Sequence, residues 1–276
     1  MAFQRTHTVE GGIERVVYTP AERRFATPIL MQHGMYHGAW CWRHWQELFA
    51  ELGWETHAHS LPGHAASPAQ RPVRWCTLGY YLRFLRAEVE RLPRRPVLIG
   101  HSMGGALAQW YFRHVGGDLP AAVLVAPWPL RTILPKEIVR WMRLDLRGLL
   151  LMWLTLSATP MIRTPARAAK MFVTEGALYT QDALHARLGP ESGWVMLQHN
   201  PPLWRPASPA QVSAPLLWLV GERDALIGVE AERASAAHYA AEFVVAPGAG
   251  HNLMMERNYR ETAMLIHDWL VAQGVP

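Results

Sequence analysis

The strongest chemical pattern in the sequence is Gly100-His101-Ser102-Met103-Gly104, a G-x-S-x-G motif. An apolar run precedes it and a stretch of helical periodicity follows it, so Ser102 is expected on a sharp turn from a strand into a helix. Glycine is needed on both sides because larger side chains would collide across such a turn. Ser102 is therefore a candidate nucleophile, and the N-terminus of the following helix points its N–H groups at the same site.

A serine hydroxyl needs a base before it acts as a nucleophile, and the chain offers 14 histidines. His251 follows an apolar run at residues 243–246 and the loop Pro247-Gly248-Ala249-Gly250, and it precedes the last predicted helix. This is the carboxyl edge of a strand, where ligands bind in open α/β sheets. We predict that His251 is the base.

An acidic residue is needed to orient the base and to stabilise its charged form. The predicted strand Leu216–Gly221 runs into Glu222 and Asp224, so the sequence offers two carboxylates. We favour Asp224 because it lies further along the loop, toward the site. Glu222 is the alternative.

A second loop supplies the other polar groups that acyl transfer requires. His33-Gly34-Met35 follows the predicted strand Pro28–Gln32, and the N–H groups of Met35 and Met103 are expected to form an oxyanion hole. Each such donor stabilises a developing oxyanion by roughly 3 kcal/mol. The residues predicted to contact the substrate are His33, Gly34, Tyr36, His101 and Trp128.

These loops need a scaffold that brings them to one edge. A hairpin of Val9–Glu10 and Ile13–Tyr18, joined by Gly11-Gly12, opens the chain. Short apolar runs then alternate with helical stretches of 10 to 15 residues. Such alternation predicts an α/β fold with a mostly parallel central sheet flanked by helices. Only helices are expected between Pro127 and Pro215, so residues 1–126 and 215–276 are predicted to form the core and residues 127–214 a helical cap.

In this order the motifs resemble the α/β-hydrolase superfamily. The segment from His33 to Trp40 is similar to the H-G-x-x-H-G-x-W run of its esterase, methylesterase and hydroxynitrile lyase branch. The resemblance implies a serine esterase or lipase that needs no cofactor and cleaves small-molecule esters through an acyl-enzyme. One departure is Ser60-Leu61-Pro62-Gly63-His64-Ala65-Ala66-Ser67, where the family has D-x-P-G-H-G-x-S, but it removes no member of the triad.

Other functions use the same triad and stay open. Thioester hydrolysis, carbon–carbon bond hydrolysis and cyanohydrin cleavage are alternatives within the enzyme class. A receptor of the hydrolase fold with slow turnover is an alternative outside it.

The predicted cap has two distinct features. Lys136, Arg140, Arg143 and Arg147 recur at helical spacing with Ile138, Met142 and Leu149 opposite, which indicates either a lid that meets a lipid surface or an ordinary cap helix with a solvated basic face. The cap also holds many large, soft side chains that can line a pocket, and these favour short-to-medium acyl esters: Trp128, Trp141, Met142, Met152, Trp153, Met161 and Met171.

Charge, histidine spacing and the N-terminal segment argue against nucleic-acid binding, metal binding and secretion. The formal net charge is +5, but its arginines are spread along the chain, which argues against nucleic-acid binding. His57, His59 and His64 lack a fourth ligand type nearby, so no metal site is expected. The N-terminal segment lacks the apolar stretch of a signal peptide, and Cys41 and Cys76 are expected to be free thiols of a cytoplasmic protein. The oligomeric state stays open.

Overall fold

The central sheet is parallel over most of its width. The computed structural model describes residues 2–276. Eight strands follow the order β1-β2-β4-β3-β5-β6-β7-β8. They are β1 (Phe3–Glu10), β2 (Ile13–Pro20), β3 (Ile29–Gln32), β4 (Thr56–Ser60), β5 (Val97–His101), β6 (Ala122–Val125), β7 (Leu216–Gly221) and β8 (Glu242–Ala246). β2 pairs antiparallel with β1 and β4 and every other neighbouring pair is parallel, which confirms the predicted sheet.

The N-terminal hairpin is longer than the sequence pattern predicts. β1 begins at Phe3 rather than at Val9, and it pairs with β2 along its whole length. Because β1 is an exposed edge strand with mostly polar residues, it has no apolar alternation by which the sequence could reveal it. Gly11 and Gly12 turn the chain with φ angles of 61° and 73°, which glycine adopts without strain.

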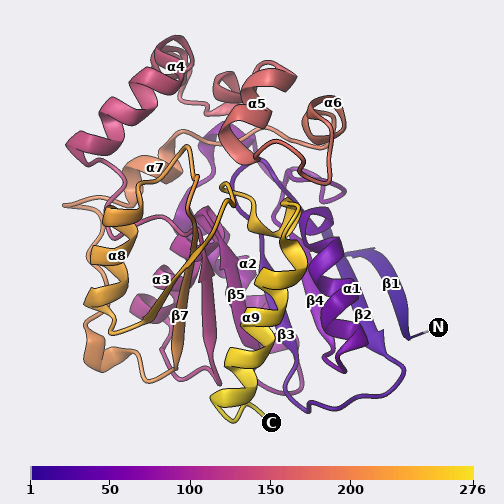
Figure 1. Cartoon of the computed structure of the whole chain (residues 1–276). Helices are drawn as coiled ribbons and strands as arrows, with labels where there is room; N and C mark the ends of the chain where they lie inside the picture. Colours follow the sequence, from indigo (N-terminus) through magenta and orange to yellow (C-terminus); the bar gives the residue numbers. More distant parts are fainter. Residues whose placement is uncertain (1) are drawn as a thin grey trace.

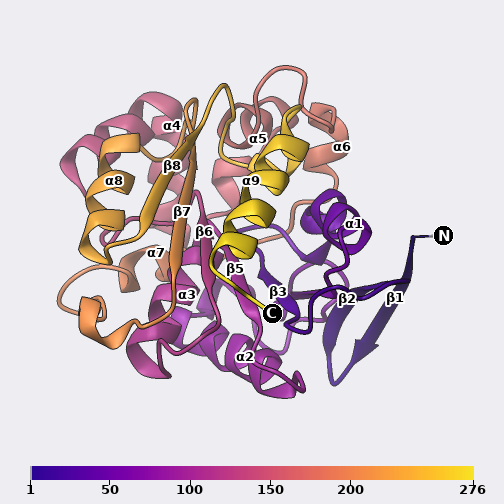
Figure 2. The ribbon, with the colours of Figure 1, turned by 60° about the horizontal axis from the view of Figure 1, so that its bottom comes forward.

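Helices cover both faces of the sheet (Figure 1, Figure 2). α1 (Arg43–Glu51) and α9 (Tyr259–Ala272) pack together on one face, and α2 (Leu78–Arg91) and α3 (Met103–His114) pack together on the other. α8 (Val229–His238) contacts β7 and β8. All residues of β3, β4, β5, β6 and β7 are buried, as expected for parallel strands between two helical layers.

The segment between β6 and β7 is helical and lies over the carboxyl ends of the parallel strands (Figure 1). We refer to residues 127–214 as the helical insertion. It contains α4 (Pro135–Thr155), η3 (Thr159–Ile162), α5 (Pro165–Phe172), α6 (Gln181–His185), α7 (Trp194–Gln198) and η4 (Pro209–Gln211). Its division from the core as a separate domain remains a prediction.

α4 is broken at Asp145, where φ is −161° and ψ is 80°. The Asp145 carboxylate accepts the N–H of Gly148 at 3.0 Å and pairs with Arg163 and Arg167, so it starts a second helical segment and fixes the break. The prediction of one continuous basic stripe is therefore wrong, because Arg147 lies beyond the break.

The structure also bears on the two cysteines and on membrane-spanning helices. Cys41 and Cys76 are both buried free thiols, as the sequence suggested. Among residues 2–276, no helix has the length and apolarity required to cross a membrane.

Candidate active site

Ser102 occupies the turn between β5 and α3 with φ of 52° and ψ of −116°, a strained conformation for a residue with a side chain. The turn is tight on every side. A Cβ at Gly100 would lie 2.5 Å from the Gly104 carbonyl oxygen, and a Cβ at Gly34 would lie 2.9 Å from the Cβ of Ser102. A Cβ at Gly104 would lie 2.2 Å from the Gln32 carbonyl oxygen, so both glycines of the motif are required by close backbone approach, as predicted.

His251 and Asp224 form a buried pair. His251 Nδ1 lies 2.7 Å from Asp224 Oδ2, and both side chains are nearly inaccessible to solvent. The other carboxylate oxygen, Oδ1, accepts the N–H groups of Leu226 at 2.7 Å and Ile227 at 3.1 Å. Glu222 is exposed and accepts the N–H of Gly248 at the surface instead. Of the two candidate carboxylates, Asp224 is the one that contacts the histidine.

The remaining nitrogen of His251 faces the cavity that Ser102 lines. Within the described residues, the buried Nε2 of His251 has no hydrogen-bond partner. The backbone of His251 is held by His101, whose Nε2–H donates to its carbonyl oxygen at 3.1 Å. Burial keeps the pKa of His101 well below its usual range, so His101 is a neutral support. The structure leaves the outer nitrogen of His251 free to exchange a proton with a neighbour in the cavity.

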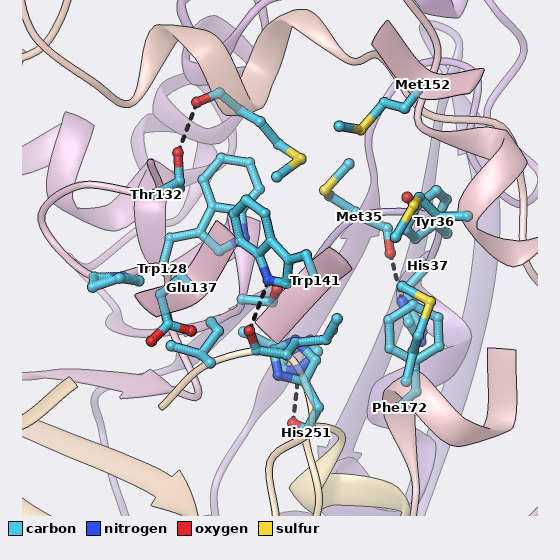
Figure 3. A pocket seen from close by; sticks show the side chains of 18 of the residues that line it. Met35, Tyr36, His37, Trp128, Thr132, Glu137, Trp141, Met152, Phe172 and His251 are labelled. Atoms are coloured by element: carbon cyan, nitrogen blue, oxygen red, sulfur yellow. Dashed lines mark hydrogen bonds between the residues drawn. The ribbon is translucent and has the colours of Figure 1, made fainter. Parts of the chain in front are cut away.

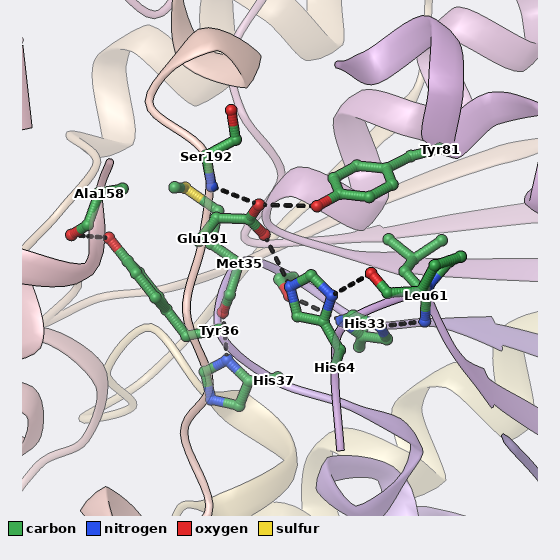
Figure 4. Close-up of polar contacts among 12 residues, drawn as sticks. His33, Met35, Tyr36, His37, Leu61, His64, Tyr81, Ala158, Glu191 and Ser192 are labelled. Carbon is green, nitrogen blue, oxygen red and sulfur yellow. Dashed lines mark hydrogen bonds and ion pairs between the residues drawn. The ribbon is translucent and has the colours of Figure 1, made fainter. Parts of the chain in front are cut away.

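His33 orients the peptide that follows it (Figure 4). Its Nε2 accepts the N–H of Leu61 at 3.0 Å, so its Nδ1 carries the proton and donates to the Gly34 carbonyl oxygen at 2.7 Å. Burial keeps the pKa of His33 well below its usual range, which agrees with a neutral ring. The Gly34 carbonyl and the Met35 N–H belong to one rigid peptide plane, so the imidazole fixes the direction of the Met35 N–H.

His37 holds the same loop from the other side. Its Nδ1–H donates to the Met35 carbonyl oxygen at 2.6 Å, and its Nε2 accepts the side-chain N–H of Asn252 at 3.0 Å. Burial lowers the pKa of His37 to about 4, so it too is neutral. The Met35 N–H itself has no hydrogen-bond partner in the part of the chain that the structure describes. Met103 opens α3, where N–H groups lack partners within the helix.

A buried carboxylate ties the helical insertion to the core (Figure 4). Glu191 Oε2 lies 3.0 Å from His64 Nε2, and neither side chain is exposed to solvent. The same carboxylate accepts the Tyr81 hydroxyl at 2.9 Å and the N–H of Ser192 at 2.7 Å. His64 therefore has a carboxylate partner rather than a place in a metal site.

No metal site is formed by the described residues, because they contain no group of three or more suitably placed His, Cys, Asp or Glu side chains. His57 is bonded to Glu55 at 2.8 Å instead. The expectation of no metal and no cofactor remains a prediction.

The cavity beside Ser102 and His251 is mainly apolar (Figure 3). Its empty space, including the open mouth, is about 720 Å³. Glu137 is the only carboxylate in its wall among the described residues. The insertion supplies most of its apolar wall, and these residues are Trp128, Pro129, Trp141, Leu149, Met152, Met161, Met171, Phe172 and Met196.

Residues 29–265, well over half of the chain, match the sequence model of the alpha/beta hydrolase family. The chain belongs to the alpha/beta hydrolase family. No curated protein sequence matches the chain.

Solved structures of similar shape agree with the family. A thermophilic esterase from Thermogutta terrifontis superposes with a TM-score of 0.69 at 22% identity, over 98% of this chain and 99% of that one. A monoacylglycerol lipase from Paleococcus ferrophilus gives 0.67 at 20% identity, over 99% and 100%. A membrane phospholipase A described as a bacterial virulence factor gives 0.71 at 18% identity, over 100% and 88%. At these identities the likeness establishes the hydrolase fold.

The substrate contacts predicted for this hydrolase chain divide into two groups. Tyr36, His101 and Trp128 line the cavity. His33 and Gly34 lie behind its wall, where the first is bonded to backbone and the second packs against Ser102. Their contact with substrate is not supported by this placement, because the Met35 loop stands between them and the cavity.

The large side chains of the insertion also divide. Met142 and Trp153 are exposed rather than in the wall, because the helix turns them to solvent. Glu137, Phe172 and Met196 line the cavity without having been singled out from sequence. A carboxylate one turn before Trp141 at helical spacing was the only signal for Glu137.

Proposed function

We propose that the protein is a carboxylic ester hydrolase in which Ser102, His251 and Asp224 form the catalytic triad. The observation that carries the proposal is the buried 2.7 Å contact of His251 Nδ1 with Asp224, beside a strained serine that lines the same cavity as the histidine. Two comparisons support the proposal: the chain belongs to the alpha/beta hydrolase family, and its structural neighbours include an esterase and a monoacylglycerol lipase.

The first half of the reaction forms an acyl-enzyme. His251 Nε2 accepts the proton of Ser102 as Oγ bonds to the ester carbonyl carbon, and the charged ring is stabilised by Asp224. The carbonyl oxygen becomes an oxyanion that accepts the N–H groups of Met35 and Met103. When the tetrahedral intermediate collapses, the C–O bond to the alcohol breaks, and Nε2 returns its proton to the leaving alkoxide.

The second half restores the serine. A water molecule attacks the acyl carbon while His251 Nε2 accepts its proton, and the same N–H groups hold the new oxyanion. Ser102 Oγ leaves with the proton from His251, which releases the carboxylic acid. His33 contributes by fixing the peptide plane that carries the Met35 N–H.

The wall of the cavity supports a preference for short-to-medium acyl chains. Four methionines from the insertion and one from the Met35 loop give it a soft apolar lining. Each buried methylene contributes about 0.8 kcal/mol, so hexanoyl can gain up to about 3 kcal/mol over acetyl.

A rate series over p-nitrophenyl esters of increasing acyl length tests this function. We expect butanoyl to octanoyl esters to be hydrolysed faster than acetyl esters. The Ser102→Ala and His251→Ala variants should each lose about 10⁴-fold or more in kcat, because removing either disables the triad as a unit. Ser213→Ala, a serine outside the cavity, is the matched control. Retention of more than about a tenth of the wild-type activity by either variant would overturn the mechanism. A preference for acetyl esters would indicate a small, specific substrate.

The alternatives give different outcomes in the same assay. A thioesterase would turn over acyl thioesters faster than the matching oxygen esters, and a lyase would release cyanide from cyanohydrins without acyl-enzyme formation. A receptor of this fold would show a single burst of product with no steady turnover.

The exposed surface of α4 supports a lipid interface as a partner. The exposed apolar residues of α4 include Val139 and Met142 before the break at Asp145, and Leu146, Leu150 and Leu154 after it, with Leu154 at 81% exposure. Exposed apolar residues beside cations are typical of helices that lie on anionic membranes. The exposed cations of α4 are Lys136, Arg143 and Arg147, whereas its two carboxylates, Glu137 and Asp145, are buried and paired with arginine.

Co-sedimentation with vesicles tests this interface. We expect binding to phosphatidylglycerol vesicles, weaker binding to phosphatidylcholine vesicles, and reduced binding of Leu154→Ser. Leu203→Ser is the matched control, because Leu203 is a similarly exposed leucine outside α4. Equal binding of both variants and the wild type would contradict the proposed contact.

A further inference from the structure

Trp141 of the insertion reaches the loop that carries Asp224. Its indole Nε1–H donates to the Leu226 carbonyl oxygen at 2.8 Å (Figure 3). One turn earlier on the same face of α4, Glu137 Oε2 accepts the N–H of Gly228 at 3.2 Å. The first turns of α4 are thus bonded to both ends of the short loop 226–228.

The peptide that Trp141 holds is the one that holds the carboxylate. The Leu226 carbonyl and the Ile227 N–H belong to the same rigid peptide plane. That N–H donates to Asp224 Oδ1 at 3.1 Å, and Asp224 Oδ2 contacts His251 Nδ1 at 2.7 Å. An unbroken series of hydrogen bonds therefore runs from the indole through one peptide group and one carboxylate to the imidazole.

Two physical consequences follow from this series. The indole restrains rotation of the 226–227 peptide, and so it restrains the direction of the N–H that Asp224 accepts. Hydrogen bonds arranged in series also polarise one another, so a donor on the carbonyl makes the N–H of that peptide a better donor. Both effects act on the orientation of the carboxylate toward His251.

We propose that Trp141 is a positioning residue that orients the Asp224–His251 pair through this single peptide plane. The helical insertion then does more than line the cavity, because its first helix completes the support of the acidic member of the triad. The kinetic consequence of the proposal rests on the proposed ester hydrolase function, whereas the structural consequence for the pair does not.

The kinetic test compares Trp141→Phe with Trp153→Phe. Phenylalanine keeps an aromatic ring in the wall and removes the N–H donor, while Trp153 is a half-exposed tryptophan of the same helix outside the cavity. The loss of one hydrogen bond of ordinary net strength predicts about a fivefold to tenfold lower kcat for Trp141→Phe with little change in KM. The acid side of its pH profile should also move to lower pH, because a less well oriented carboxylate stabilises the charged histidine less.

A spectroscopic test needs no turnover. Because the contact between His251 Nδ1 and Asp224 is short, at 2.7 Å, its proton is expected to give a strongly downfield proton NMR signal. This signal should shift and broaden in Trp141→Phe and stay unchanged in Trp153→Phe. A second protein with 3-benzothienylalanine in place of Trp141 keeps the fused ring and lacks the N–H, so it separates the donor from packing and folding effects. It should show the same shift.

The outcomes are distinguishable. An unchanged signal and unchanged kcat in the benzothienyl protein would overturn the positioning role, as would equal changes in the Trp153→Phe control. A change in KM alone would show that Trp141 only shapes the pocket, which also overturns it. A shifted signal in a protein that hydrolyses no ester would uphold the positioning of the pair and refute the proposed function instead.

Discussion

Replacing Asp224 by asparagine is expected to hold His251 in an unproductive tautomer. Asp224 Oδ1 accepts the N–H groups of Leu226 and Ile227, so only an oxygen atom fits at that position. In Asp224→Asn the amide oxygen must take it, and the amide NH2 must then face His251 Nδ1 from the 2.7 Å position of Oδ2. Because an amide N–H only donates, Nδ1 becomes an acceptor and the ring proton moves to Nε2.

The expected loss follows from that proton. A ring protonated at Nε2 cannot accept the proton of Ser102. In the productive tautomer Nδ1 carries the proton, so two N–H donors, one from the amide and one from the ring, would face and repel each other. The substitution also removes the negative charge that stabilises the charged His251. An exchange of this kind lowers kcat by about 10⁴-fold, or about 5.5 kcal/mol in the barrier.

Steady-state hydrolysis of p-nitrophenyl butanoate measures the effect, with circular dichroism to verify folding. Glu222→Gln is the matched control, because the Glu222 carboxylate is exposed and accepts the N–H of Gly248 at the surface. We expect that variant to stay within about twofold of wild type, as surface substitutions usually do. If Asp224→Asn keeps more than about a tenth of the wild-type kcat, or if Glu222→Gln is the weaker enzyme, the tautomer argument is refuted.

Three further results are expected. The kcat/KM value should fall at acidic pH, because the base must be neutral to accept the proton of Ser102. A flat profile from about pH 5 to about pH 8 would count against a histidine as the base. Gly34→Ala should lower kcat by about tenfold or more, because the new Cβ would lie 2.9 Å from the Cβ of Ser102 and displace the serine. Unchanged kinetics would contradict this, because they would mean that the loop moves aside without displacing Ser102. Burial alone would raise the pKa of Glu88, but hydrogen bonds from Arg15 lower it to about 2 from an ordinary 4.5, so this pair stabilises the fold above pH 4.5. In urea unfolding, the advantage of wild type over Glu88→Gln should therefore be lost as the pH falls from about 4.5 to about 2, and a constant difference would argue against this ion pair.

Much of the framework could be predicted because its signals are local. The apolar run before Ser102, the flanking glycines and the helical spacing after them are properties of one short segment, and the turn they predict is the one observed. The helix and strand alternation that predicts a parallel sheet is equally local. β1 was underestimated because an exposed edge strand depends on its partner rather than on its own pattern.

Other features depend on packing between distant segments. Sequence order left both Glu222 and Asp224 as partners for His251, and the decision came from the two N–H groups that hold Asp224 within the loop. His33 occupies a motif position next to the cavity, yet its ring turns inward because it bonds the backbone of Leu61 from another strand's loop. Spacing along a single segment carries no information about such contacts.

The amino-acid pattern alone was enough to predict the hydrolase framework, the position of Ser102 on its turn and the candidates for base and acid. Those features follow from backbone sterics and hydrophobic periodicity, which act over a few residues. Three features appear only in the folded chain: the contact of Asp224 with His251, the break of α4 at Asp145, and the hydrogen bond from Trp141 to the loop beyond β7. Each of these requires a hydrogen bond or ion pair whose geometry exists only after the insertion has packed onto the carboxyl edge of the sheet.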